Sequence, residues 1–123
     1  MAHVLLIDDD EQFRIMLEQM LTQDGHRVTI ASDGEQGLRL ALETKPDLVI
    51  TDILMPRKDG IETILAMSQA GLTIPIIATS GGRRAISAQF NLDSAGMLGV
   101  KVTLPKPFSR GDLREAIKRA LIP

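Results

Sequence analysis

Five polar residues stand where apolar runs of the chain end, and their types suit phosphoryl chemistry. Asp8 and Asp9 follow VLLI, Asp52 follows LVIT, Ser80 follows IPIIAT and Lys106 follows VTLP. Three carboxylates brought together cannot all stay ionised without a counter-charge, so either their pKa values rise or a cation binds among them. A hard divalent ion with oxygen ligands and retained water fits such a cluster, and Mg²⁺ is the cofactor we expect.

A carboxylate beside such an ion is arranged to attack phosphorus. Aspartate side chains in proteins do form aspartyl phosphates. The metal and Lys106 would neutralise charge on the equatorial oxygens of the transition state, and Ser80 would donate a hydrogen bond to a phosphoryl oxygen. These residue types therefore indicate phosphoryl transfer to one of the aspartates, provided that the fold brings them together.

The strands that must position these residues are indicated by apolar, β-branched runs. Such runs predict strands at His3–Ile7, Arg27–Ala31, Leu48–Thr51, Ile74–Ala78 and Val100–Leu104. Runs such as LVI and IPIIA are apolar almost throughout, which fits strands buried on both faces of a parallel sheet.

Helical spacing of apolar residues fills the intervals between the strands. Two helices show a clear buried stripe: Phe13, Met16, Leu17, Met20 and Leu21, and Leu113, Ala116, Ile117, Ala120 and Leu121. The last helix begins after Ser109, with Asp112 three residues on as an acidic variant of a capping box. Helices are also predicted at 35–44 and 61–70. The segment 85–98 predicts only a short or frayed helix, because polar and glycine residues interrupt its stripe.

Strict alternation of strands and helices predicts an α/β fold with a parallel sheet between two layers of helices. We expect a single doubly wound (βα)5 domain over residues 1–123. In such open sheets, ligands bind beyond the carboxyl ends of the strands, at the point where the strand order reverses. The polar residues that close the apolar runs all belong to that edge. If the order is 2-1-3-4-5, the first and third strands are neighbours and the three aspartates converge.

Composition narrows the classes of function. With 123 residues, 44% of them apolar, the chain is expected to form one domain with one core. The net charge of -2 argues against direct binding of nucleic acid or of an anionic membrane. The absence of cysteine excludes disulfides, thiolate metal sites and cysteine nucleophiles, and a cytoplasmic location is expected. The sequence shows neither a membrane-spanning run nor a signal peptide.

The same residues also have purely structural interpretations. One aspartate of DDDE could cap the helix that follows, and Asp10 is the strongest candidate, but a cap needs only one carboxylate. Ser80 precedes two glycines and could belong to a flexible loop, while Thr79 beside it offers a second hydroxyl. Lys106 could be an exposed residue next to a proline turn.

Four motifs resemble those of the receiver domain of bacterial response regulators, over essentially the whole chain. They are LLIDDDE, ITDILMPRKDG, IIATSGG and LPKPF. Each motif alone is weak, but all four in order and at the family's spacing make chance agreement improbable. The resemblance implies a flavodoxin-like sheet of order 2-1-3-4-5.

The resemblance also implies how the acidic residues are used. Asp52 matches the phosphoacceptor and Asp9 a direct ligand of Mg²⁺, while Asp8 acts mainly through metal-bound water. Asp52 itself is also a metal ligand in this pattern, and the backbone carbonyl of Leu54 completes the protein's share of the coordination.

The resemblance assigns the remaining residues to the switch. Ser80 matches the switch hydroxyl, and Lys106 matches the lysine that contacts the phosphoryl group and is joined to Pro107 by a cis peptide bond. Many receivers carry an aromatic residue three positions before this lysine. Thr103 stands there in this sequence and cannot present a ring, so output through an aromatic rotamer is not expected.

The implied function is that of a signalling module in a two-component phosphorelay. It would take a phosphoryl group from a histidine kinase or a histidine phosphotransfer protein and change its affinity for a downstream protein. Phosphorylation-dependent homodimers belong to the same expectation. As an enzyme it would catalyse only its own phosphoryl transfer and slow autodephosphorylation.

Three alternative functions have a basis in the sequence. The Asp8-x-Asp10 spacing occurs in small aspartate-based phosphatases, but Gln12 departs from their motif and their fold usually needs a longer chain. A flavin-binding domain would need a phosphate loop after the first strand, where DDDE would repel the phosphate. A degenerate receiver acting as a phosphorylation-independent scaffold is disfavoured by the intact acidic residues, Ser80 and Lys106.

Overall fold

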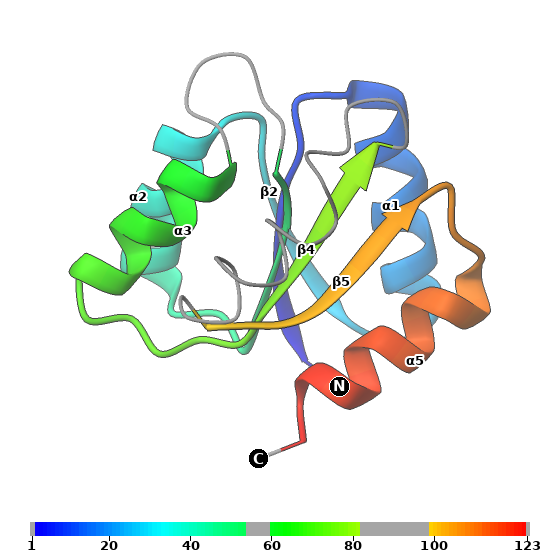
Figure 1. Ribbon diagram of the computed structural model, residues 1–123. Coiled ribbons are helices and arrows are strands. Elements are labelled where there is room, and N and C mark those ends of the chain that lie inside the picture. The colour runs from blue at the N-terminus through cyan, green and yellow to red at the C-terminus, as the bar shows by residue number, and fades with distance from the viewer. Residues whose placement is uncertain (1, 54–59, 82–98, 123) are drawn as a thin grey trace.

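The computed structural model describes residues 2–53, 60–81 and 99–122, and it places them in one five-stranded parallel sheet with helices on both faces (Figure 1). The strands are β1 (His3–Ile7), β2 (Arg27–Ala31), β3 (Leu48–Asp52), β4 (Ile76–Gly81) and β5 (Val100–Lys106). The described helices are α1 (Glu11–Gln23), α2 (Gly34–Thr44), α3 (Gly60–Gln69) and α5 (Arg110–Ala120). The strand order is β2-β1-β3-β4-β5, which confirms the predicted fold class and order.

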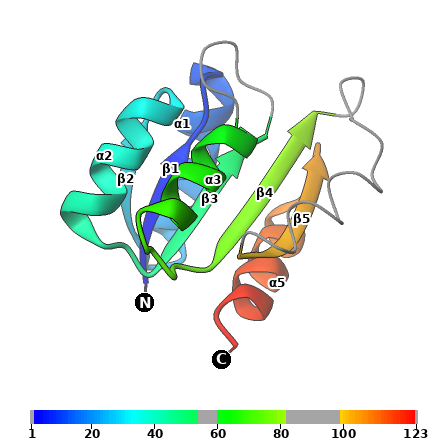
Figure 2. The same ribbon diagram turned by 60° about the vertical axis from the view of Figure 1, so that its left-hand side comes forward.

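The alternation of side chains along the strands divides the core into two layers. Val4 and Leu6 of β1 pack with buried residues of α1 and α5, whereas Leu5 and Ile7 pack with buried residues of α2 and α3. Figures 1 and 2 show the same division, with α2 and α3 on one side of the sheet and α1 and α5 on the other. The strand ends are therefore held from both faces.

Four strand boundaries differ from those predicted: β3 ends at Asp52 and not at Thr51, β5 ends at Lys106 and not at Leu104, and β4 differs at both ends. β4 begins at Ile76 and not at Ile74, because Pro75 has no N–H for the ladder, although its carbonyl accepts a hydrogen bond of 3.0 Å from the N–H of Val49. The strand also continues through Ser80 to Gly81, since these residues pair with Pro105 and Lys106 of β5. Ser80 and Lys106, the two candidate residues expected just after these strands, thus lie within them. The helix predicted at 85–98 lies outside the described residues.

Side-chain caps fix where the helices on either side of the sheet begin. The predicted capping box of α5 is confirmed: Ser109 Oγ accepts from the N–H of Asp112, and the Asp112 carboxylate accepts from the N–H of Ser109, both at 3.0 Å. Asp33 caps α2 through a bond of 2.8 Å from the N–H of Gln36. After α3, Gly71 has a φ of 82°, the left-handed conformation expected of a helix stop.

An ion-pair cluster joins the C-terminal end of α1 to the first turns of α5. Asp24 accepts hydrogen bonds from Arg110 Nη2 at 2.6 Å and from Arg114 Nη2 at 2.9 Å and Nε at 3.0 Å. The hydrogen bonds from Arg114 and then from Arg110 hold the pKa of the Asp24 carboxyl well below its usual range. This cluster fixes the position of α1 relative to α5, the two helices that cover one face of the sheet.

We expect Asp24→Asn to lower the thermal midpoint at neutral pH and to flatten its acid dependence. A carboxyl whose pKa is depressed by folding contributes stability above its unfolded pKa, near 3.9, and this contribution disappears as pH falls through the folded pKa. Thermal melts at pH values from 7 down to 2 would measure this, with the wild type losing its advantage over the variant below about pH 4. Parallel curves at all pH values would contradict the assignment.

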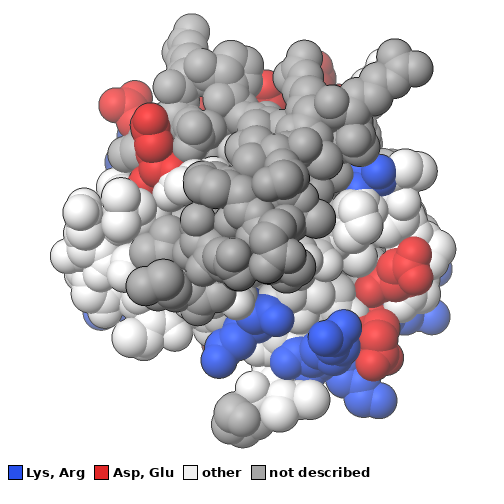
Figure 3. Space-filling model, viewed as in Figure 1, with Lys and Arg blue, Asp and Glu red and all other residues white. Residues whose placement is uncertain are grey.

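The described surface carries charges of both signs. On the face in Figure 3, lysine and arginine atoms gather along the lower edge, and acidic side chains lie beside them at the lower right. Among the described residues, no helix is both long and apolar enough to cross a membrane.

Candidate functional site

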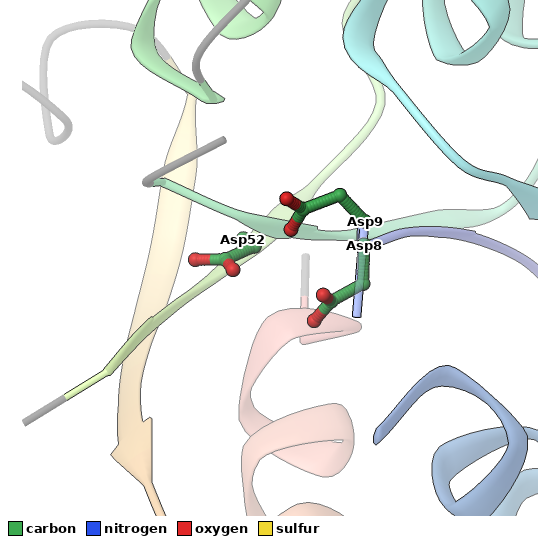
Figure 4. A group of neighbouring side chains, drawn as sticks. All are labelled: Asp8, Asp9 and Asp52. Atoms are coloured by element: carbon green, nitrogen blue, oxygen red, sulfur yellow. The ribbon is translucent and has the colours of Figure 1, made fainter. Parts of the chain in front are cut away.

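The three predicted carboxylates meet at the carboxyl edge of the sheet. Asp8 and Asp9 directly follow β1, and Asp52 is the last residue of β3, the strand paired with β1. Figure 4 shows the side chains of Asp8 and Asp9 projecting from the end of β1 toward that of Asp52. One carboxylate oxygen from each residue lies within 4.8 Å of the others. The convergence predicted from the strand order is therefore present.

Asp8 is the most deeply held member of this acidic cluster, with a residue exposure of 1%. Its Oδ1 accepts a hydrogen bond of 2.9 Å from the N–H of Asp10, and its Oδ2 accepts one of 2.9 Å from Lys106 Nζ. Burial raises the pKa of the Asp8 carboxyl, and these two hydrogen bonds offset only part of that rise. A further cation near Asp8 would stabilise its ionised form.

Lys106 supplies a fixed positive charge to the cluster from the end of β5. Its Nζ lies 2.9 Å from Asp8 Oδ2 and 3.2 Å from Asp52 Oδ2, and its side chain is 16% exposed. Burial alone would lower the pKa of this ammonium, but the hydrogen bonds and charges of the two aspartates outweigh it and raise the pKa. The lysine therefore stays protonated and bridges two carboxylates. The Lys106–Pro107 bond is cis, as the family resemblance implied.

The aspartates of DDDE divide between structure and site. Asp10 is the N-cap of α1, because its Oδ1 accepts a hydrogen bond of 3.2 Å from the N–H of Phe13. Asp8 and Asp9 are left for the cluster, and Asp9 is exposed. The cap thus gives a structural reason for Asp10, the second aspartate of the Asp8-x-Asp10 spacing on which the phosphatase alternative depends.

The hydroxyl side of the site is described only in part. Thr79 is the register partner of Asp52, and its buried hydroxyl lies 3.5 Å from the carbonyl oxygen of Thr51. The backbone of Ser80 continues β4 beside Pro105, but its side chain lies outside the described part of the structure. The predicted metal ligand Leu54 also lies outside the described residues.

The chemistry of the donor set fits a hard divalent cation. The ligands that the cluster offers are carboxylate oxygens, the type that Mg²⁺ selects, and exposed Asp9 leaves a side open for retained water. Lys106 compensates part of the negative charge of Asp8 and Asp52, the two carboxylates with which it forms ion pairs. The residues present therefore suit the Mg²⁺ site expected from the sequence.

Phe13 is a contact of this site that the sequence did not reveal. Its place in the apolar stripe of α1 predicted a core residue, and it does pack against the buried core. The ring also lies against the Lys106 ammonium, 4.0 Å from ring centroid to Nζ. The apolar spacing of a helix predicts which face of the helix a residue lies on. It does not predict that a lysine from a distant strand will contact that residue.

Fold and site together define a flavodoxin-like α/β domain. Its acidic cluster, which could bind a cation, lies at the carboxyl edge of the sheet where the strand order reverses. The chain belongs to the response regulator receiver domain family, whose model matches residues 4–118. The resemblance in the four sequence motifs is thereby confirmed at the level of the family.

Curated relatives are proteins about twice as long as this chain. It is 36% identical over 121 residues to the transcriptional regulatory protein CpxR of Escherichia coli K12, covering 98% of the chain and 50% of that protein. It is 32% identical over 118 residues to the alkaline phosphatase synthesis transcriptional regulatory protein PhoP of Bacillus subtilis, covering 96% and 48%. The chain thus spans about half the length of these relatives.

Solved structures of similar size share the whole fold. The chemotaxis protein CheY4 of Vibrio cholerae has a TM-score of 0.87 and 29% identity, with 98% of this chain and 99% of that chain covered. A response regulator receiver domain protein of Clostridium thermocellum has a TM-score of 0.86 and 29% identity, with 98% and 94% covered.

Proposed function

We propose that Asp52 accepts a phosphoryl group from a histidine kinase or a histidine phosphotransfer protein, and that this modification changes the affinity of the domain for a downstream protein. The observation that carries the proposal is the acidic cluster itself. Three carboxylates from two neighbouring strands offer oxygens within 4.8 Å, and the Lys106 ammonium spans two of them.

The reaction is a displacement at phosphorus. An oxygen of Asp52 forms the new P–O bond while the P–N bond of the donor phosphohistidine breaks. The departing imidazole nitrogen keeps the electron pair of that bond, and the other ring nitrogen carries the single proton of the neutral imidazole. The product is an acyl phosphate, a mixed anhydride of the Asp52 carboxylate. Lys106, held in place by Asp8, is positioned to bind a phosphoryl oxygen and to offset the charge gathered there.

The metal would be held by Asp9, Asp52 and the carbonyl of Leu54, with Asp8 contributing through bound water. When bound, Mg²⁺ supplies charge neutralisation for the phosphoryl oxygens. Both oxygens of Asp8 already accept hydrogen bonds within the protein, which suits a fixed outer ligand better than a nucleophile. Asp52 remains as the strand-end carboxylate that contacts Lys106 through the longer bond.

Output would pass to a protein partner through the elements beside the site. Ser80 and Lys106 lie near the ends of the adjacent strands β4 and β5, which are already paired there, so a phosphoryl group bound by both would link these strand ends to Asp52 of β3. Thr103, in place of the aromatic residue common at this position, leaves backbone movement as the proposed route. Relatives named as transcriptional regulators point to a regulatory output, and a phosphorylation-dependent homodimer is one form of it.

Intact mass spectrometry after incubation with acetyl phosphate or another small phosphodonor tests this proposal. We expect a gain of one phosphoryl group when Mg²⁺ is present and none when a chelator removes it. No gain with several donors and with a phosphorylated histidine phosphotransfer protein would favour the scaffold alternative.

We expect Asp9→Asn to weaken Mg²⁺ binding by about tenfold or more, because one anionic ligand of a hard cation is lost. Calorimetric titration with Mg²⁺ would measure the change. Asp10→Asn is the matched control, since it removes the same charge one residue away and asparagine caps helices as well as aspartate does. Equal weakening in both variants would mean that net charge attracts the ion and that Asp9 is not a ligand.

A further inference from the structure

A series of contacts links Lys106 to the start of α1 and returns to Lys106. The ammonium donates to Asp8 Oδ2 at 2.9 Å, and Asp8 Oδ1 accepts from the N–H of Asp10 at 2.9 Å. Asp10 Oδ1 accepts from the N–H of Phe13 at 3.2 Å, and the Phe13 ring returns to Lys106 at 4.0 Å. The residue that caps α1, Asp10, and the lysine of β5, Lys106, therefore belong to one connected network of contacts.

The orientation of the Phe13 ring is fixed from a second side. Phe108 meets it edge to face, with 5.5 Å between ring centroids and an interplanar angle of 87°. Both rings pack against the buried core formed by β1, β3, β4, β5, α1 and α5. The sequence contains three phenylalanines and neither Trp nor Tyr, and two of the three are used here: Phe13 lies against the lysine, and Phe108 packs against Phe13.

We infer that Phe13 is a positioning residue for Lys106: its ring face holds the ammonium at the acidic cluster while leaving its N–H groups able to turn toward a phosphoryl oxygen. An ammonium has three donors, and the two carboxylates take two of them. The negative face of the ring attracts the cation without demanding a particular N–H direction. A third carboxylate in its place would bind the lysine more rigidly and add negative charge where a phosphoryl group must enter.

The inference rests on the proposed phosphoacceptor function, because positioning matters only if Lys106 meets a phosphoryl group. It predicts two separable observables. One is the rate of phosphoryl uptake, which depends on the reaction. The other is the magnetic environment of Lys106, which depends only on the ring lying against the ammonium.

The decisive experiment replaces Phe13 by phenylalanine bearing one, two or three ring fluorines, introduced at that position in the full chain. Each fluorine withdraws charge from the ring face while the volume changes little, so packing is nearly preserved and the attraction for the ammonium falls in steps. We expect the rate of phosphorylation by acetyl phosphate with Mg²⁺ to fall stepwise, by about fivefold across the series. Thermal melts of each variant establish that the fold is unchanged.

Two controls separate positioning from packing. In a Lys106→Ala background the fluorine series should have no effect, because the cation that senses the ring is gone. By NMR, the ε-methylene protons of Lys106 should resonate upfield in the wild type through the ring current and return toward ordinary values in Phe13→Leu.

The outcomes distinguish this inference from the proposed function. Equal rates across the fluorine series, in a chain that is still phosphorylated on Asp52, would overturn the role of Phe13 alone. An ordinary chemical shift for Lys106 in the wild type would overturn it whatever the rates. If the wild type accepts no phosphoryl group, the proposed function fails, and the shift of Lys106 still decides whether the ring holds the ammonium.

Discussion

Asp52→Asn is expected to abolish phosphoryl uptake, with a fall of at least about 10³-fold in rate. The amide that replaces the carboxylate is a poor nucleophile and cannot form a stable acyl phosphate. Asp52 is 7% exposed at the end of β3, so the variant changes one atom at a position where the strand, not the side chain, fixes the backbone. Quantifying the phosphorylated fraction against time, at saturating donor and Mg²⁺, measures the loss.

A matched variant is available for this comparison. Asp33→Asn makes the same charge change at the N-cap of α2, where asparagine serves equally well. We expect it to be phosphorylated at the wild-type rate. Residual uptake by Asp52→Asn at a rate near that of Asp33→Asn would show that another residue accepts the phosphoryl group.

Lys106→Ala is expected to slow phosphoryl uptake by about 10²-fold without preventing Mg²⁺ binding. Removal of one preorganised charge at a developing anionic centre typically costs this much in rate. The structure gives the reason for the large effect, because the ammonium lies within hydrogen-bonding distance of both Asp8 and Asp52. Lys101→Ala, an exposed lysine of the same strand, is the control and should leave the rate unchanged.

The same variant should also change how stability depends on pH. The pKa of Lys106 is raised in the folded chain, so its contribution is fully present below its unfolded pKa, near 10.4, and is lost only as pH rises above that value. Its removal takes away the ammonium that pairs with the buried Asp8 carboxylate, which raises the pKa of Asp8 further and penalises its ionised form. The loss of thermal stability in Lys106→Ala should therefore be larger at pH 7 than at pH 4. An equal loss at both values would mean that the ammonium does not stabilise the ionised carboxylate.

The sequence predicted those features that depend on local pattern. The apolar runs at β1 and β2, the stripe of α1 and the capping box of Ser109 and Asp112 each have a periodicity or spacing that a short segment carries by itself. The start of β4 was predicted two residues too early, because Pro75 lies inside an apolar run. The apolar pattern takes no account of the N–H that proline lacks.

The site required more than local pattern. Lys106 and Asp8 are 98 positions apart, and their contact follows only from the order of the strands, which the family resemblance supplied. The contact of Phe13 with Lys106 depends in addition on how α1 packs against the sheet, and the Asp10 cap fixes only where that helix begins. No spacing in the sequence encodes that packing.

The most direct test of the central claim is to trap the modified residue chemically. Borohydride reduces an acyl phosphate to an alcohol, so a phosphorylated aspartate becomes homoserine and peptide mass spectrometry can locate it. After incubation with phosphodonor and Mg²⁺, we expect homoserine at position 52 and none when Mg²⁺ is withheld. Homoserine at Asp8 or Asp9, or a phosphoryl group that survives reduction on another side chain, would contradict the assignment of Asp52 as the acceptor.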